Sequence, residues 1–327
     1  MGNLWHVKNW FRVGHNISWS LNLHTLGGFL FLSFPNKFFY HQAQEKHKFI
    51  LNYLRNEMRD IIAKYQDMPK ESSSAPSFTE HFIWTLWWQG EDNAPPLVRA
   101  CLNQMRANAN GAELVLISKD NWQEYIDIPD YILSKLDKCW ISFAQLSDII
   151  RFLLLERYGG LWLDATVYTA SPIPGSCFDL PFYSQHTLPS EMTCWVQNNR
   201  YHGFIIGSHP HAKLVSFVKD FFLEYWKTHD TLVDYLMIDY VIMLAYQQFP
   251  DIKSEIDSLP WSSERLYDMV TMLNQAYSPL EFDKLKSECL FSKLDWHKKY
   301  RLSVAGKETL YSKLTTSPDY SSSTRWK

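Results

Sequence analysis

The segment spanning residues 143–167 constrains the fold more than any other part of the chain. Apolar residues at helical spacing predict a helix over 143–157, and an apolar run predicts a strand over 161–167. Gly159 and Gly160 lie between them and are typical of a helix end, because glycine readily adopts positive φ angles. A helix that leads through a tight turn into a buried strand predicts an α/β fold.

The remaining sequence continues this alternation. Strands are predicted over 82–88, 113–118 and 204–207, and helices over 95–105, 211–228 and 232–249. Strands that alternate with helices are typical of a domain with a largely parallel sheet. The sequence therefore predicts an α/β domain in its central part.

Two further segments precede that domain. Residues 41–66 have the spacing of one amphipathic helix, and the polar, proline-bounded stretch 69–76 reads as a linker. We therefore expect a helical appendage with its linker over 1–76, the main domain over 77–300 and a tail over 301–327. The appendage either packs on the main domain or serves as a docking surface.

Charge and hydropathy narrow the function classes. The formal net charge is -3, with Lys and Arg spread along the chain, which excludes the basic footprint of a nucleic-acid-binding protein. The apolar run at 29–34 is far shorter than the roughly 20 residues of a spanning helix, and we find no signal peptide. The cysteines form no Cys-x-x-Cys pair and read as buried thiols. We expect a cytoplasmic protein.

The aromatic N-terminal segment suggests a peripheral contact with the inner face of the cell membrane. Trp5, Trp10 and several Phe residues lie there among Lys8, Arg12 and Lys37, a mixture that suits a membrane interface. Packing of these aromatic side chains on the main domain is the alternative. The oligomeric state is left open.

Three polar residues mark a candidate site. Asp148 and Arg151 are three apart on the predicted helix and share one face. Asp164 follows near the C-terminal end of the next strand, on the same side as Trp162, and ligands of open α/β sheets bind at such ends. The alternatives are a surface ion pair for Asp148 and Arg151, and a turn or cap aspartate for Asp164.

The same residues resemble a known family. The string S-D-x-x-R-x-x-x-L-x-x-Y-G-G-x-W-x-D-A-T is similar to the donor-binding signature of capsular polysaccharide synthesis proteins, which are related to glycosyltransferase family 32 and its DXD sugar-binding region. The resemblance implies a GT-A-like, Rossmann-type nucleotide-sugar-binding domain. It implies a retaining hexosyltransferase that uses a nucleotide-diphosphate sugar, expected to be a UDP-sugar. The implied acceptor is a saccharide, as a lipid-linked oligosaccharide, in capsular or exopolysaccharide synthesis.

The resemblance also assigns roles to residues. The implied donor-binding residues in this segment are Asp148, Arg151, Tyr158, Gly160, Asp164 and Thr166. Asp164 and Arg151 are the implied catalytic residues, and Asp164 would hold a divalent cation, Mn²⁺ or Mg²⁺. Thr166 stands where a full DXD has its second aspartate, and a hydroxyl is a poor substitute for a carboxylate ligand, so metal dependence is left open.

Two later segments complete the expected site. Residues 292–299 resemble a C-terminal Lys-Leu-Thr-Trp-Lys element of the family, with Asp295 in place of Thr. Lys293 and Lys298 would then clamp the diphosphate and Trp296 would close over the donor, whereas the alternative is a basic surface loop. On the predicted helix 232–249 we take Asp239, rather than Asp234, as the catalytic candidate.

Two other functions remain open from the sequence. A sugar-phosphate transferase would also place charged groups around a diphosphate, but it should show more than one Arg/His cluster. A non-catalytic partner in a capsule assembly complex is favoured by Thr166, which breaks the DXD pattern. Donor hydrolysis by the purified protein, and the product released, distinguish the three functions.

Overall fold

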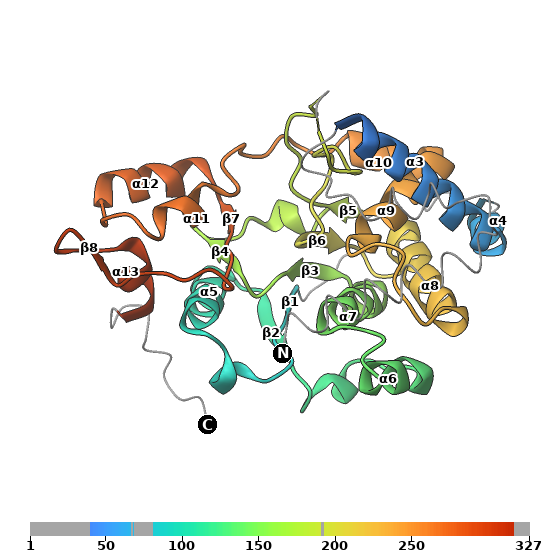
Figure 1. Cartoon of the computed structure of the whole chain (residues 1–327), viewed down its shortest axis with the longest axis horizontal. Helices are drawn as coiled ribbons and strands as arrows, with labels where there is room; N and C mark the ends of the chain where they lie inside the picture. The colour runs from blue at the N-terminus through green and yellow to red at the C-terminus, as the bar shows by residue number, and fades with distance from the viewer. Residues whose placement is uncertain (1–39, 67, 69–80, 191–192, 317–327) are drawn as a thin grey trace.

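The structure, a computed structural model, describes residues 40–66, 68, 81–190 and 193–316 (Figure 1). Its main sheet consists of β1 (Phe82–Leu86), β2 (Glu113–Ile117), β3 (Gly160–Leu163), β5 (Phe182–Tyr183) and β6 (Ile205–Ser208). The strand order is β2-β1-β3-β6-β5. The strands β2, β1 and β3 are parallel, whereas β6 runs antiparallel to both β3 and β5. The sheet, predicted to be largely parallel, is therefore mixed.

Helices cover both faces of this sheet. They are α3 (Tyr40–Glu57), α4 (Arg59–Gln66), α5 (Pro96–Ala107), α6 (Asp130–Asp137), α7 (Phe143–Tyr158), α8 (Lys213–Thr228), α9 (Met237–Gln248), α10 (Pro250–Asp257), α11 (Asp268–Met272), α12 (Pro279–Glu288) and α13 (Leu310–Thr316). Figure 1 shows α7, α8 and α9 on one side of the sheet, and α5 with the C-terminal helices on the other. The predicted α/β fold is confirmed.

The alternation of side chains along the strands explains this arrangement. Trp84 and Trp162 lie in one apolar core with α7, α8 and α9, whereas their neighbours Ile83 and Leu161 lie in a second core with α5 and the C-terminal helices. Successive residues of a strand point to opposite faces, so a strand that is apolar throughout must be covered on both sides.

The predicted strand over 161–167 is in fact two strands. β3 ends at Leu163, and a turn closed by a 2.8 Å hydrogen bond from the Val167 N–H to the Asp164 carbonyl follows. The chain then enters β4 (Val167–Thr169), which pairs with β7 (Phe291–Lys293) in a separate two-stranded sheet. Asp164 therefore lies directly after a parallel strand, and the turn brings a C-terminal segment beside it.

The helices before the linker belong to the main core. α3 contacts α9 and α4 contacts α8, and Ile50, Leu54 and Ile62 are buried in the same cluster as the sheet residues. The single helix expected over 41–66 breaks at Met58. The aromatic residues proposed for membrane contact precede residue 40 and, like most of the linker, lie outside the described residues. A deletion that tests this contact must therefore end before α3.

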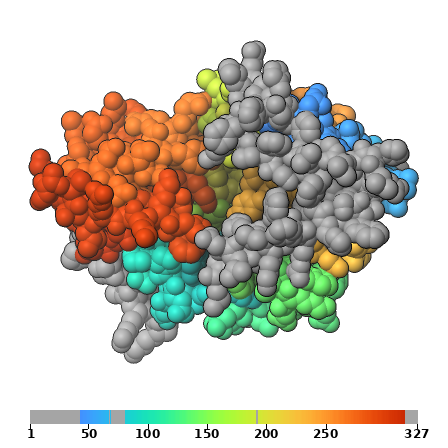
Figure 2. All heavy atoms as spheres, in the orientation of Figure 1, coloured from blue at the N-terminus to red at the C-terminus, as the bar shows by residue number. Residues whose placement is uncertain are grey.

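The C-terminal segment also packs on the main domain. Leu310 and Leu314 of α13 are buried in the second core, and α13 contacts α5. Figure 2 shows the red surface of this segment lying against the cyan surface of α5. None of the five cysteines forms a disulfide. Cys101, Cys177 and Cys289 are buried as expected, whereas Cys194 is half-buried and Cys139 is exposed. Within the described ranges, every helix is too short or too polar to cross a membrane.

Gly160 at the start of β3 offers a test of the packing between strands. Its φ is +96°, and a Cβ at this position would lie 2.5 Å from the Phe82 carbonyl oxygen of β1. We expect Gly160→Ala to lower the free energy of unfolding by about 2–4 kcal/mol, because backbone strain and overpacking add. Gly111→Ala is the matched control, since Gly111 has φ +89° and open space around its Cα. Equal losses in urea denaturation would show that the contact with Phe82 costs nothing.

Candidate active site

Helix α7 positions the first two site residues. It begins after Ser142, whose hydroxyl accepts a hydrogen bond from the Gln145 N–H, and it ends at Gly159. Because α7 lies between the sheet and α8, most of its residues are buried, and Asp148 and Arg151 are among them. Their side chains are only 11% and 5% exposed, so the alternative of a surface ion pair is wrong.

Arg151 links three elements of the site. Its Nη2 lies 3.3 Å from Asp148 Oδ1 and 3.0 Å from Asp164 Oδ1, and its Nη1 donates to the Gly203 carbonyl. The guanidinium also lies 4.8 Å from the centroid of the Trp162 ring. A planar guanidinium suits this position, because its several N–H groups point in fixed directions toward different acceptors. Arg151 thus fixes α7 against the end of β3.

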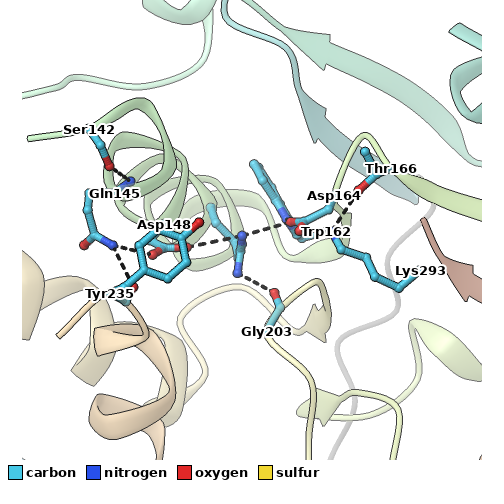
Figure 3. A network of polar contacts seen from close by, with 10 residues as sticks. Ser142, Gln145, Asp148, Trp162, Asp164, Thr166, Gly203, Tyr235 and Lys293 are labelled. Carbon is cyan, nitrogen blue, oxygen red and sulfur yellow. Dashed lines mark hydrogen bonds and ion pairs between the residues drawn. The ribbon is translucent and has the colours of Figure 1, made fainter. Parts of the chain in front are cut away.

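Asp164 lies between two cationic side chains. Its Oδ1 accepts from Arg151 and, at 2.9 Å, from Trp162 Nε1, and its Oδ2 lies 2.6 Å from Lys293 Nζ. Figure 3 shows Asp164 between the α7 side of the site and Lys293. Burial acts to raise the pKa of Asp164, but Lys293 and Arg151 hold it below its usual value. Asp164 is therefore ionised at neutral pH and anchors both cations.

Lys293 joins the site through β7. The register of β7 against β4 places Lys293 opposite Val167, and the Leu294 N–H donates to the Thr166 carbonyl at 2.9 Å. The Lys293 ammonium reaches Thr166 Oγ1 at 2.8 Å in addition to Asp164. The structure thus brings Lys293 together with the residues of the DXD-like motif, although 129 positions separate it from Asp164.

Two buried carboxyl groups, those of Asp148 and Asp239, lie near each other and near Arg151. Asp239, in the first turn of α9, is 6% exposed and Asp148 is 8% exposed. Burial, with Asp148 nearby, raises the pKa of Asp239 to about 7. Burial also raises the pKa of Asp148 to about 7, against the opposing effect of Arg151. Both carboxyl groups therefore exchange a proton near neutral pH.

These raised pKa values predict a pH-dependent stability. The folded protein keeps a proton on Asp239 from about pH 4 to about pH 7, where the unfolded chain has lost it, so the Asp239 contribution to the free energy of unfolding falls as pH rises. Asp239→Asn removes this contribution. We expect the variant to gain stability relative to the wild type by roughly 1 kcal/mol per pH unit across this range, measured by urea denaturation from pH 5 to pH 7, and to gain little more between pH 7 and pH 8.

Asp283→Asn is the control for that measurement, because Asp283 is 68% exposed and pairs with Lys286 on the surface of α12. Its stability relative to the wild type should not change between pH 5 and pH 8. If Asp239→Asn behaves like this control, Asp239 titrates as an ordinary surface carboxylate.

Two further residues of the sequence motif, Tyr158 and Gly160, lie away from Asp164. Tyr158 lies at the far end of α7 from Asp148, where its hydroxyl donates to the Tyr125 carbonyl at 2.8 Å and its ring packs on Trp84. Gly160 begins β3, at the opposite end of the strand from Asp164. The structure does not bring either of them to the Asp164 cluster.

The aromatic part of the C-terminal element lies near the same sheet edge. Trp296 is 38% exposed, and its ring contacts Trp87 edge-on with a centroid distance of 5.3 Å. Trp87 follows β1, the parallel neighbour of β3, so it lies at the same edge of the sheet as Asp164. Lys298 is exposed, and it is not among the hydrogen-bond or ion-pair partners of Asp164 in the part of the chain that the structure describes.

Sequence reasoning missed three participants. The Gly203 carbonyl accepts from Arg151, Gln145 Nε2 lies 3.4 Å from Asp148 Oδ2, and Trp87 has a buried indole N–H with no partner among the described residues. Gln145 lies three positions before Asp148 on α7, so helical spacing alone could have placed the two side chains on one face. A backbone carbonyl leaves no such signal.

The donor set does not fit the divalent cation that the resemblance implies. Both Asp164 oxygens are bonded to cationic or N–H donors, and Thr166 Oγ1 accepts from Lys293. No group of three His, Cys, Asp or Glu side chains suited to a metal occurs in the part of the chain that the structure describes. Mg²⁺ and Mn²⁺ prefer several hard oxygen ligands.

Comparisons with known proteins give the family. No curated protein matches the chain significantly. Among solved structures, the chain is similar to the PaToxG glycosyltransferase, with 14% identity and a TM-score of 0.38 over 66% of this chain and 82% of that one. It is also similar to the apo structure of the bifunctional glycosyltransferase WbbM, with 11% identity and a TM-score of 0.37 over 73% of this chain and 50% of that one.

Both structural likenesses are remote. The family model for capsular polysaccharide synthesis proteins, in contrast, matches residues 33–314. This range includes the whole sheet, α7 and the segment that carries Lys293. The chain therefore belongs to the capsular polysaccharide synthesis protein family.

Proposed function

We propose that the chain is a glycosyltransferase of the GT-A type that moves a hexose from a nucleotide-diphosphate sugar to a saccharide acceptor in capsular or exopolysaccharide synthesis. The observation that supports this most is the pair of cations, Arg151 and Lys293, held 3.0 Å and 2.6 Å from Asp164 at the end of a parallel strand. Ligands of α/β sheets bind at this edge. The family membership adds the capsular context.

The arrangement suits departure of a diphosphate. Cleavage of the bond between sugar and diphosphate leaves negative charge on the leaving group, and preorganised cations stabilise that charge. Lys293 and Asp164 are 23% and 27% exposed, so a ligand can reach them, whereas Arg151 is almost fully buried and orients Asp164. Asp164 is thus the proposed catalytic residue that touches the donor, and Arg151 supports it.

The donor base is proposed to lie toward Trp296. Trp87 and Trp296 form an aromatic corner at the same sheet edge, and a nucleobase stacks favourably on such side chains. We take the donor to be a UDP-sugar and the transfer to retain the anomeric configuration, as the family resemblance implies. The acceptor is proposed to be a lipid-linked oligosaccharide, met at the cytoplasmic face of the membrane by a peripheral contact.

The test is a screen of nucleotide sugars for binding and slow hydrolysis by the purified full chain, with and without Mn²⁺. We expect one nucleotide sugar to bind and to release free hexose and nucleoside diphosphate. Release of a sugar phosphate and a nucleoside monophosphate would indicate a sugar-phosphate transferase instead. Binding without turnover, even with acceptor present, would favour a non-catalytic partner with Thr166 in a degenerate motif.

A further inference from the structure

We propose that the Lys293 ammonium takes the place of a divalent cation at the donor diphosphate, so that donor binding and transfer need no metal. This inference rests on the proposed function and specifies how its site holds the diphosphate. It follows from the position of one side chain relative to Asp164 and Thr166, the two ends of the DXD-like motif.

The ammonium lies where the motif would otherwise hold a metal. Lys293 Nζ is 2.6 Å from Asp164 Oδ2 and 2.8 Å from Thr166 Oγ1, and so bridges the two motif side chains (Figure 3). The other carboxylate oxygen accepts from Arg151 and Trp162. A metal ion at this position would have to displace Lys293 from both of its acceptors.

The backbone fixes this position. Lys293 is the last residue of β7 and lies opposite Val167 of β4, so two strands hold its Cα beside the turn that carries Asp164. The Leu294 N–H bonded to the Thr166 carbonyl locks the next residue as well. The ammonium also lies 5.4 Å from the centroid of the Phe204 ring, which packs along one side of it. Lys293 is therefore part of a built site.

One donor of the ammonium remains for a ligand. An ammonium group has three N–H donors, and Asp164 and Thr166 accept two of them among the described residues. The side chain is 23% exposed, so a phosphate oxygen can approach the third. A lysine that binds phosphate as a point charge is a common arrangement.

The charge balance points the same way. Asp164 carries one negative charge, and Arg151 and Lys293 carry one positive charge each, so this trio is positive before a diphosphate arrives. Asp148 lies 3.3 Å from Arg151, and burial raises its pKa to about 7, so it adds a negative charge only in the molecules in which it is ionised. A divalent cation added between Asp164 and Thr166 would be repelled by two cations at close range, and Coulomb repulsion is strong where water is partly excluded. An anionic diphosphate is attracted by the same arrangement.

The test measures binding of UDP, GDP and ADP to the full chain by calorimetry, once with EDTA and once with Mn²⁺. For the nucleotide that binds, we expect the wild-type affinity to differ by less than about threefold between the two conditions. We expect Lys293→Met to weaken binding by roughly tenfold or more in both conditions, since a charge-assisted contact to phosphate is lost. Lys293→Arg keeps the charge and should retain most of the affinity.

Lys307→Met is the matched control, because Lys307 is an exposed lysine on β9 (Lys307–Glu308) and its loss changes the net charge equally. Wild-type binding that requires Mn²⁺ overturns the inference, and this arm decides even if Lys293→Met does not fold. Lys293→Met that binds like the wild type overturns it as well. Absence of binding by any nucleotide or nucleotide sugar, with or without Mn²⁺, overturns the proposed function and this inference with it.

Discussion

Asp164→Asn is expected to reduce the proposed sugar transfer by at least about 100-fold, the scale seen when a preorganised polar group is removed from the charge that develops in a transition state. Asparagine keeps the size of the side chain but loses the charge that holds Arg151 at 3.0 Å and Lys293 at 2.6 Å. Its amide N–H₂ would also face one of these cations as a donor opposite a donor. Lys293 is then free to move away from the diphosphate, and Arg151 no longer holds the side chain at position 164 in place.

The measurement is transfer from the donor identified by the screen, with the free energy of unfolding measured in parallel. Because Asp164 is 27% exposed, we expect a loss of stability of only about 1–3 kcal/mol, which leaves the variant folded. Asp283→Asn removes an exposed carboxylate from a surface ion pair and should leave transfer unchanged. Full activity of Asp164→Asn would remove Asp164 from the reaction and with it the proposed site.

The sequence predicted α7 and β3. It also predicted the site residues in the N-terminal half of α7 and at the C-terminal end of β3. Helical spacing placed Asp148 and Arg151 on one face, and strand alternation placed Asp164 on the same side as Trp162; the structure shows both relations. Local periodicity determines them, because residues within one element have fixed relative directions. The orientation of Asp164 could thus be predicted without any knowledge of the rest of the chain.

Contacts between distant segments were beyond such reasoning. Nothing in the periodicity of residues 291–293 shows that β7 pairs with β4, and only the family resemblance pointed to Lys293. Gly203 lies in the loop before β6, and its carbonyl approaches Arg151 only because the fold brings this loop to α7. Long-range pairing is decided by the packing of the whole domain, not by local propensity.

Proximity in sequence was misleading for Tyr158 and Gly160. Both belong to the same motif as Asp148 and Asp164, yet α7 rises by about 1.5 Å per residue, so its two ends lie far apart. Tyr158 packs on Trp84 and Gly160 lies against Phe82, at the start of β3. Their place in the motif is explained by the tight passage from helix to strand, which in turn sets where Asp164 falls.

The largest loss of stability is expected for Arg151→Met, by about 3–5 kcal/mol, together with loss of measurable transfer. The side chain is 5% exposed and bonds to Asp148, Asp164 and the Gly203 carbonyl. Methionine fills part of the volume but leaves buried acceptors without donors. The free-energy cost of such unsatisfied acceptors is larger than the stabilisation that the original hydrogen bonds contributed. The stability of Arg151→Lys should lie between those of the wild type and Arg151→Met, because an ammonium cannot reproduce the planar fork that spans these acceptors.

Arg157→Met on the same helix is the control, since the Arg157 side chain is 53% exposed and its ion pair with Asp127 spans 3.8 Å. It should cost at most about 1 kcal/mol and leave transfer intact. Urea denaturation and transfer, both measured at low temperature where Arg151→Met stays folded, separate the two roles of Arg151. A variant that is unstable but fully active when folded would make Arg151 a structural residue only, and one with wild-type stability would show that the network around Asp148 does not depend on it.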